Sequence, residues 1–276
     1  MVGILVLHYR RNPWTEGCLL SLRQLRDANY RVILVDNGSQ DGSGQELQHK
    51  FPEVDFVPIA TNCGFGGGNN QGARRAQELG CTSLWILNND TRVFPDSLSA
   101  LLACQSGERD AVGSVLFEMD SDPQRLQLWG GGRVDLHTGD ARYSLSPSEP
   151  LDYITGASLL ISSQTFFELG GFDERFFLYW EDSDLCWRLK KLGGQLKVAP
   201  RSRVLHRGGG SMGGHHSPFH DYHMTLSSVH FYRRHAPWPL LPTFCFAARR
   251  ILWRLRTRNW PCVLAVLRAM GRAWLS

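Results

Sequence analysis

The sequence has no two cysteines at C-x-x-C spacing and no long apolar run. Its seven cysteines are irregularly spaced and none belongs to a C-x-x-C pair, which excludes a zinc ribbon and a thioredoxin-like redox site. The odd number argues against a disulfide framework and favours a reducing compartment. No apolar stretch reaches the roughly 18–20 residues that a membrane-spanning helix needs. We therefore expect a cytoplasmic protein.

Acidic residues are absent from the C-terminal part of the chain. After Asp221 there is no Asp, Glu or Lys, whereas nine arginines follow. These arginines carry +9, and because the whole chain has a formal net charge of +4, the first 221 residues carry −5. A nucleic-acid-binding protein needs a broad basic surface, so the net charge of −5 on residues 1–221 argues against that class. The two parts therefore have different roles or different neighbours.

The composition is that of a folded protein. Hydrophobic residues make up 42% of the 276 residues, which provides for a sizeable core and excludes a disordered chain. The length fits one large domain, or one domain with an appendage. A glycine-rich segment at residues 208–214 predicts a flexible break before the basic part. We therefore expect a main domain over residues 1–215 and a basic helical extension over residues 216–276.

Short segments rich in Val, Ile and Leu alternate with segments of helical periodicity through the first half of the chain. Strands are predicted at residues 2–7, 31–35, 54–59, 83–87 and 111–117, and helices at residues 15–29, 41–50, 69–79 and 96–104. This β-α-β alternation predicts an α/β fold with a Rossmann-like, mostly parallel sheet. Such sheets bind ligands beyond the carboxyl ends of their strands, where Asp36 and residues 88–90 stand.

The second half is less regular. Residues 118–150 are rich in Gly, Ser, Pro and Asp, and this composition predicts a long loop or an irregular hairpin over the sheet. Beyond it we expect a strand at residues 154–161, helices at residues 163–169 and 183–192, and short strands at residues 196–198 and 204–206.

Polar and glycine-rich segments follow several of the predicted strands. Asp36 opens a Gly-rich turn, so its carboxylate can accept hydrogen bonds from a base or a ribose, although an ordinary turn has the same composition. Residues 62–72 contain five glycines and enter a helix, which suits close backbone approach to a phosphate. The segment is neither a P-loop nor a G-x-G-x-x-G motif after a strand. We interpret it as a ligand-binding loop rather than a merely flexible one.

Carboxylates and one histidine offer catalytic and metal-binding chemistry. Asp90 lies just past a predicted strand, where a carboxylate either binds a divalent ion or belongs to a turn. His206 lies at another strand end and is either a second metal ligand or a structural histidine. Glu181 and Asp182 begin a helix after an aromatic run. They either complement the helix dipole or provide a general base.

These segments together resemble glycosyltransferase family 2, inverting enzymes of the GT-A fold, and within it the rhamnosyltransferase-like branch that builds bacterial surface polysaccharides. The resemblance covers residues 1–215 and implies that they form a GT-A catalytic domain. The segments that carry it are Val35–Ser39, Asn62–Gly72, Leu87–Asp90, Thr155–Ala157, Gly170–Asp173, Glu181–Arg188 and His206–Ser211.

The resemblance implies roles for individual residues. Asp36 would hold the nucleotide base, and Asp90 would bind Mg²⁺ or Mn²⁺ on the diphosphate. Asn88 stands where the family's metal motif begins with a carboxylate, which raises the importance of His206 as a metal ligand. The Glu181-Asp182 motif would carry the catalytic base, assigned to Asp182. Further contacts to the nucleotide sugar are implied for Asn62, Gly64, Gly66, Asn69, Asn89 and Gly156.

The implied reaction is a direct displacement at the anomeric carbon of a dTDP- or UDP-linked sugar. The leading candidate is L-rhamnose from dTDP-rhamnose, transferred to a hydroxyl of a glycan or lipid-linked glycan. A nucleotidyltransferase on a similar sheet is the alternative enzyme, and the Glu181-Asp182 motif speaks against it. A nucleic-acid-binding protein that uses the Arg-rich tail is the non-enzymatic alternative, and we expect no nucleic-acid partner.

The basic tail shows helical periodicity. An apolar side is expected to consist of Phe244, Ala247, Ala248, Ile251, Leu252 and Leu255. Arg249, Arg250, Arg254 and Arg256 are expected on its flanks or opposite side, with Trp253 among them. The helix either packs on the main domain or lies in an anionic membrane surface. In the second case residues 237–276 would place the enzyme peripherally at the inner face of the cell membrane.

Overall fold

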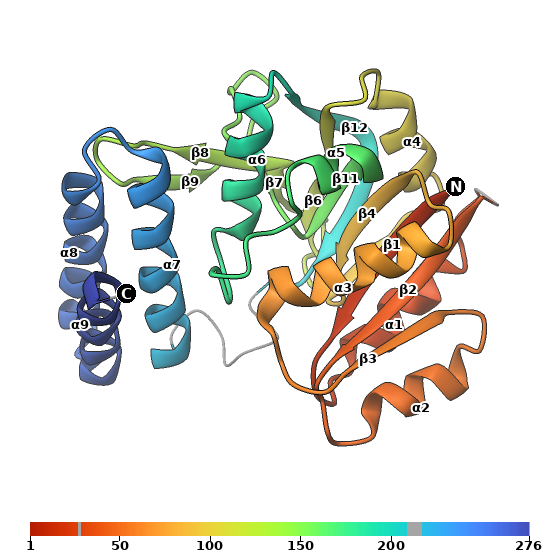
Figure 1. The fold of residues 1–276 in the computed structure, drawn as a ribbon, viewed down its shortest axis with the longest axis horizontal. Helices are drawn as coiled ribbons and strands as arrows, with labels where there is room; N and C mark the ends of the chain where they lie inside the picture. The colour runs from red at the N-terminus through yellow and green to blue at the C-terminus, as the bar shows by residue number, and fades with distance from the viewer. Residues whose placement is uncertain (27–28, 209–216, 276) are drawn as a thin grey trace.

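The central layer of the protein is a nine-stranded sheet (Figure 1). A computed structural model describes residues 1–26, 29–208 and 217–275. The strand order is β3-β2-β1-β4-β11-β6-β12-β5, with β7 paired to β6. Six strands run in one direction, whereas β5, β7 and β11 run against them, so the sheet is mostly parallel as predicted. Its strands are β1 (Val2–His8), β2 (Tyr30–Asn37), β3 (Asp55–Ile59), β4 (Ser83–Asn88), β5 (Thr91–Val93), β6 (Asp110–Glu118), β7 (Leu126–Trp129), β11 (Ser158–Ser162) and β12 (Gln195–His206).

Helices cover both faces of the sheet because its strands are apolar on both sides. In β1, Ile4 and Val6 contribute to one buried cluster, and Leu5 contributes to the other. The first cluster includes side chains of α1, α2 and α4, and the second includes side chains of α3, α5 and α6. This two-sided burial is typical of a doubly wound α/β fold. The helices are α1 (Trp14–Leu22), α2 (Ser43–Lys50), α3 (Gly64–Glu78), α4 (Ser97–Cys104), α5 (Ser163–Glu168) and α6 (Glu181–Lys191).

The glycine-rich segment is helical, which the sequence did not indicate. The prediction began the helix at Asn69, but α3 begins at Gly64. Glycine disfavours a helix interior, yet here it permits close packing, because a Cβ on Gly68 would overlap the side chain of Leu7 in β1. Gly64 has a φ of +80°, and a Cβ there would overlap the carbonyl oxygen of Phe177. The segment therefore fits tightly between the sheet and the loop before α6.

Residues 118–150 are more ordered than their composition predicts. They contain β7 and the hairpin of β8 (Gly131–Val134) and β9 (Ala141–Tyr143). The hairpin joins β10 (Tyr153–Ile154) in a separate three-stranded sheet. The strand expected at residues 154–161 is divided into β10 and β11, and the two short strands expected between residues 196 and 206 form the single strand β12.

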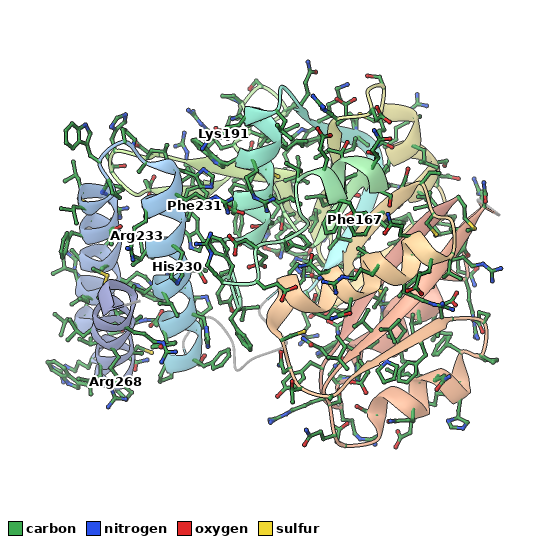
Figure 2. All side chains as sticks on the ribbon, viewed as in Figure 1. Phe167, Lys191, His230, Phe231, Arg233 and Arg268 are labelled. Carbon is green, nitrogen blue, oxygen red and sulfur yellow. The ribbon has the colours of Figure 1, made fainter. Side chains whose placement is uncertain are left out.

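Three helices follow the main sheet: α7 (Pro218–His235), α8 (Leu240–Arg256) and α9 (Trp260–Leu275). Figure 1 shows them together, with α7 beside α6 and with the β8–β9 hairpin reaching toward them. Figure 2 labels Phe231 of α7 in the space between α7 and α6, where its ring packs against Trp187 at a centroid distance of 5.8 Å. Residues 209–216 lie outside the described part of the chain. They include all but the first residue of the expected break at residues 208–214, the expected boundary at residue 215, and the end of the His206–Ser211 segment. Among the helices described, none is long and apolar enough to cross a membrane.

The orientation of α8 corrects the prediction for its arginines. Arg254 is 1% exposed, and its Nε lies 2.5 Å from Oδ2 of the buried Asp221 in α7. Arg250 also pairs with Asp221. Both arginines therefore lie on the packed side of α8, because a buried carboxylate requires a counter-charge. Of the side predicted to be apolar, Phe244 and Leu252 are more than half exposed, whereas Ala247 is buried.

Candidate active site

A cavity of about 560 Å³ lies where the carboxyl ends of β2, β4 and β12 meet the start of α6. Its wall includes residues from the ends of three parallel strands, namely Asn37, Asn88 and His206. This is the edge of a parallel sheet at which ligand sites are expected. The cavity brings together most of the predicted site residues: Asn62, Gly64, Asn89, Asp90, Gly156, Glu181, Asp182 and His206.

Three predicted residues do not line the cavity. Asp36 is buried and directly precedes Asn37, which does line the cavity. Its Oδ1 accepts hydrogen bonds from the backbone N–H and the hydroxyl of Ser39. Gly66 packs against Phe172, and Asn69 donates a hydrogen bond from Nδ2 to the backbone oxygen of Phe65. These residues shape the strand end and helix α3 behind the wall.

Asn37, which the sequence analysis did not single out, joins the strand end to the glycine-rich segment. Its Nδ2 donates to Oδ1 of Asn62 and to the backbone oxygen of Gly64, each at 3.0 Å. Its Oδ1 accepts from the backbone N–H of Cys63 at 3.1 Å. Asn37 could have been identified from the sequence, because it directly follows Asp36 in the same polar turn. Asn37 fixes the wall formed by residues 62–64 against β2.

Asp90 and His206 converge at one side of the cavity. Oδ1 of Asp90 lies 3.4 Å from Nε2 of His206. Nδ1 of His206 lies 2.7 Å from the acceptor Oε1 of Gln127 in β7, which favours the tautomer with its proton on Nδ1, and in that neutral tautomer Nε2 carries the lone pair. An imidazole lone pair and a carboxylate oxygen facing the same point suit a shared cation, and they are donor types that Mn²⁺ accepts. The residues thus fit a divalent ion bound through two protein ligands.

No third carboxylate, thiol or histidine of the described residues completes a metal cluster at this point. Asn88 contributes an amide whose Nδ2 lies 3.5 Å from Nε2 of His206. The neighbouring Asn89 points elsewhere, because its Nδ2 donates to Oγ1 of Thr15 at 2.8 Å. A metal held here would therefore depend on a ligand for its remaining coordination.

Asp182 stands in the first turn of α6 with its carboxylate held by backbone donors. Oδ2 accepts from the N–H of Gly156 at 2.9 Å, and Oδ1 accepts from the N–H of Ser183 at 2.7 Å. Burial raises the pKa of Asp182 above its ordinary value, and these hydrogen bonds act in the opposite direction. The carboxylate is thereby oriented while its basicity is increased.

Glu181 is 6% exposed and its Oε2 has no hydrogen-bond partner among the described residues. Burial and the neighbouring Asp182 carboxylate raise the pKa of Glu181 well above its ordinary value. The two adjacent carboxyls therefore titrate as a coupled pair, in which the doubly ionised form is disfavoured.

Two strained residues set the start of α6. Tyr179 and Trp180 both have a φ of +70°, a conformation that is costly for bulky side chains and concentrates at functional sites. Trp180 is held by packing against Phe231 of α7 and Phe246 of α8, at centroid distances of 4.8 and 5.7 Å. The C-terminal helices therefore support the turn that presents Glu181 and Asp182.

The C-terminal helices also line the cavity, through Met224 of α7 and through Phe246 and Arg250 of α8. The sequence analysis placed the tail outside the site. The sequence analysis did not consider Asp221, the last acidic residue of the chain, as a partner for the tail. This buried carboxylate pairs with Arg250 and Arg254 and so fixes which side of α8 faces inward. The tail and the sheet form one cavity wall.

The fold is that of GT-A glycosyltransferases. The family model described as "Glycosyl transferase family 2" matches residues 4–148, slightly more than half of the sequence, and the chain belongs to this family. It is therefore a glycosyltransferase, the enzyme class that the motifs implied, rather than the alternative nucleotidyltransferase.

Two curated relatives are rhamnosyltransferases. The N-acetylglucosaminyl-diphospho-decaprenol L-rhamnosyltransferase of Mycobacterium tuberculosis is 29% identical over 264 residues, covering 86% of each chain. The dTDP-rhamnosyl transferase RfbF of Shigella flexneri is 20% identical over 200 residues, covering 71% of this chain and 66% of the relative. The chain thus resembles the rhamnosyltransferase branch, as its motifs indicated.

The fold is shared with solved glycosyltransferases. The mannosyltransferase PcManGT of Pyrobaculum calidifontis, solved with GDP-Man and Mn²⁺, superposes with a TM-score of 0.62 at 16% identity. The match covers all of this chain and 75% of the mannosyltransferase. It confirms the predicted GT-A fold.

Proposed function

We propose that the protein transfers L-rhamnose from dTDP-rhamnose to a hydroxyl of a lipid-linked glycan in bacterial surface-polysaccharide synthesis, with inversion at the anomeric carbon. The activities of the two relatives support the sugar, the nucleotide and the lipid-diphosphate acceptor. The observation that carries the proposal is the Asp182 carboxylate, which lines one cavity together with the strand ends and with α7 and α8.

The donor occupies the part of the cavity formed by the strand ends. The end of β2 receives the nucleotide base, and Asp36 holds that strand end from behind the cavity wall through its hydrogen bonds with Ser39. Asn62 and Gly64 line the part that accommodates the nucleotide sugar, and Gly66 and Asn69 pack behind them. Asn89, Asp90 and Gly156 complete this part of the site.

Asp90 and His206 would hold Mg²⁺ or Mn²⁺. Such an ion supplies charge neutralisation to the departing nucleoside diphosphate. The 3.4 Å separation of Asp90 Oδ1 and His206 Nε2 supports their joint role. Gln127 orients the imidazole through Nδ1, which keeps Nε2 directed at Asp90.

Asp182 acts as the general base. It accepts the proton of the acceptor hydroxyl while that oxygen attacks the anomeric carbon and the bond to the diphosphate breaks. The N–H groups of Gly156 and Ser183 keep the carboxylate oriented. Burial and the adjacent Asp182 raise the pKa of Glu181, which disfavours two adjacent negative charges.

Residues 216–276 extend the catalytic domain of residues 1–215 and place it on an anionic membrane, at the inner face of the cell membrane. The support is an apolar stripe on each of two helices, which we call the exposed stripes. They consist of Leu240, Leu241, Phe244, Leu252 and Leu255 on α8, and Trp260, Leu264 and Leu267 on α9, each 37–61% exposed. Arginines close to an anionic surface each contribute about 1 kcal/mol, which suits reversible binding.

A screen of nucleotide sugars tests the proposed activity. Purified full-length protein is incubated with Mn²⁺ and dTDP-rhamnose, UDP-glucose, UDP-N-acetylglucosamine or GDP-mannose, with and without an N-acetylglucosaminyl-diphospho-lipid acceptor. We expect transfer from dTDP-rhamnose and a product whose anomeric configuration is opposite to that of the donor. Transfer from a different donor, or retention of configuration, would contradict the proposal.

A further inference from the structure

The three-stranded sheet of β8, β9 and β10 forms the part of the cavity wall that adjoins α6. In β10, the backbone N–H of Ile154 donates to Sγ of Cys186 at 3.3 Å. Two residues further on, the N–H of Gly156 donates to Oδ2 of Asp182 at 2.9 Å. Asp182 and Cys186 are four residues apart and therefore share one side of α6. The small sheet thus lies against the side of the helix that carries the proposed base.

The far end of the β8–β9 hairpin is fixed as well. Nη1 of Arg249 in α8 donates to the backbone oxygen of Thr138 in the turn at 2.9 Å. A Cβ on Gly139 in the same turn would overlap the backbone oxygen of Pro242, so the turn rests directly on α8. Figure 1 shows the hairpin extending to the C-terminal helices. The small sheet is therefore held at both ends and forms a rigid part of the wall.

One face of this sheet presents two tyrosines to the cavity. Tyr143 in β9 and Tyr153 in β10 are both in register with Gly132 of the middle strand β8, so their side chains leave the same face. A Cβ on Gly132 would lie 2.7 Å from the hydroxyl oxygen of Tyr153. The ring of Tyr153 therefore lies across Gly132, toward Tyr143. Both tyrosines line the cavity.

Tyr143 is the accessible member of this pair. It is 58% exposed, whereas Tyr153 is 8% exposed. Among the residues that the structure describes, the Tyr143 side chain has no hydrogen-bond partner and no aromatic ring in contact. Desolvation by the surrounding protein and the charge of Asp182 nevertheless raise the pKa of Tyr143 above its ordinary value. A side chain that is both accessible and surrounded by protein borders a hollow, and this hollow contains Asp182.

A free aromatic ring beside a carboxylate suits a sugar ring as its ligand. The face of an aromatic ring carries partial negative charge, which attracts the weakly positive C–H groups on one face of a pyranose. The hydroxyls around the rim of the sugar stay free to reach polar groups such as Asp182. Binding cavities commonly combine aromatic side chains with a few polar groups in this way.

The geometry of an inverting displacement assigns this wall to the acceptor. The attacking hydroxyl approaches the anomeric carbon from the side opposite to the departing diphosphate. The diphosphate is assigned to Asp90 and His206 at strand ends of the central sheet, so the acceptor enters from another wall. Tyr143 and Tyr153 belong to the separate small sheet, and the charge of Asp182 acts on both of them.

We propose that Tyr143 is the stacking platform for the acceptor sugar whose hydroxyl attacks the donor. The proposal rests on the proposed function, since it assigns one wall of the same cavity to the second substrate. Tyr153 and Gly132 support the platform within the small sheet. Stacking on Tyr143 places the acceptor hydroxyl beside Asp182, so Tyr143 is a binding residue and Asp182 remains the base.

Equilibrium binding of two soluble probes tests the platform without requiring turnover. One probe is N-acetylglucosaminyl diphosphate esterified with a short alkyl chain, and the other is the same alkyl diphosphate without the sugar. Full-length protein is used with saturating dTDP and Mn²⁺, so that the donor site is filled. Wild type should bind the sugar-bearing probe more tightly. Tyr143→Ala should weaken binding of this probe about tenfold and leave binding of the sugar-free probe unchanged, whereas Tyr143→Phe retains the ring and should bind as wild type.

Leu145→Ala is the matched control, because Leu145 is also 58% exposed, follows Tyr143 by two residues and lies outside the cavity lining. It should bind both probes as wild type. Equal binding of the sugar-bearing probe by wild type and Tyr143→Ala would overturn the platform. An equal loss in Tyr143→Phe would also overturn it, because the hydroxyl and not the ring would then hold the sugar.

The sugar-free probe separates the platform from other sources of affinity. Wild-type protein that binds the two probes equally, or Tyr143→Ala that loses affinity for both alike, would contradict the proposal. Failure of the proposed function has a different signature. Transfer from dTDP-rhamnose would then be absent, while sugar-dependent binding and its loss in Tyr143→Ala would persist.

Discussion

The backbone N–H of Gly156 donates to Oδ2 of Asp182 at 2.9 Å, which ties the turn between β10 and β11 to the first turn of α6. The sequence separates the two residues by 26 positions. The hydrogen bond fixes one carboxylate oxygen of Asp182, and the N–H of Ser183 binds the other. The proposed base is therefore oriented before any substrate binds, which would reduce the reorganisation needed during the reaction.

The raised pKa of Asp182 predicts the acid side of the pH profile. A base works when ionised, so activity falls as pH drops through its pKa. Because burial raises the pKa of Asp182, this loss should occur above the ordinary aspartate value of about 3.9. The measurement is kcat/KM for transfer against pH. An acid limb at or below the ordinary value would mean that another group is the base.

The neighbouring Glu181 predicts a pH-dependent stability effect. Its pKa is raised on folding, so the native state binds more protons than the unfolded state and stability falls as pH rises above the ordinary glutamate value. Glu181→Gln removes this slope. Its Tm should match wild type near about pH 4 and exceed it near about pH 8. Glu108→Gln, at an exposed position, should show no such trend, and an equal Tm difference at both pH values would contradict the burial effect.

The Asp90–His206 pair predicts metal dependence. EDTA should abolish transfer, and added Mn²⁺ should restore it. Asp90→Ala should weaken dTDP binding in the presence of Mn²⁺ and make it nearly independent of the metal. Calorimetric titration with dTDP, with and without Mn²⁺, measures both effects. Full activity in EDTA would show that side chains neutralise the diphosphate without an ion.

The exposed stripes predict reversible membrane binding. Full-length protein should sediment with anionic liposomes at low ionic strength and be released as salt rises. Leu252→Glu should weaken sedimentation, whereas Leu20→Glu, at a leucine of α1 that is 47% exposed against 56% for Leu252, should not. Point variants are preferable to deletion of residues 237–276, because the deletion also removes Phe246, which packs on Trp180. Wild-type protein that stays in the supernatant would contradict the prediction.

The sheet could be predicted because its strands are apolar on both faces and its helices follow them in regular order. Helix α3 began earlier than predicted, because tertiary contact at Gly68 outweighs the low helix propensity of glycine. For residues 118–150 a long loop or an irregular hairpin was expected, and β8 and β9 form a hairpin, but the bounds of β7, β8 and β9 were not predicted because these strands are only three or four residues long. Gln127, which orients His206, lies in β7 and was not singled out.

The cavity residues Asp90 and His206 at strand ends and Asp182 in the first turn of α6 could also be predicted, since all three belong to the motifs. The role of the tail could not. Helical periodicity identified an apolar side of α8, but the buried side is selected by Asp221 on another helix, which pairs with Arg250 and Arg254. A charge pair between two helices leaves no periodic signal within either one.

The most direct test of the account is turnover of Asp182→Asn with dTDP-rhamnose and a lipid-diphosphate acceptor. The change preserves size and removes basicity. We predict that kcat falls by about 10²–10⁴ while the KM for the donor and the Tm stay near wild type. Glu181→Gln, measured in parallel, should retain far more activity. Near-normal turnover of Asp182→Asn would contradict the account, and a larger loss in Glu181→Gln would transfer the role of base to that residue.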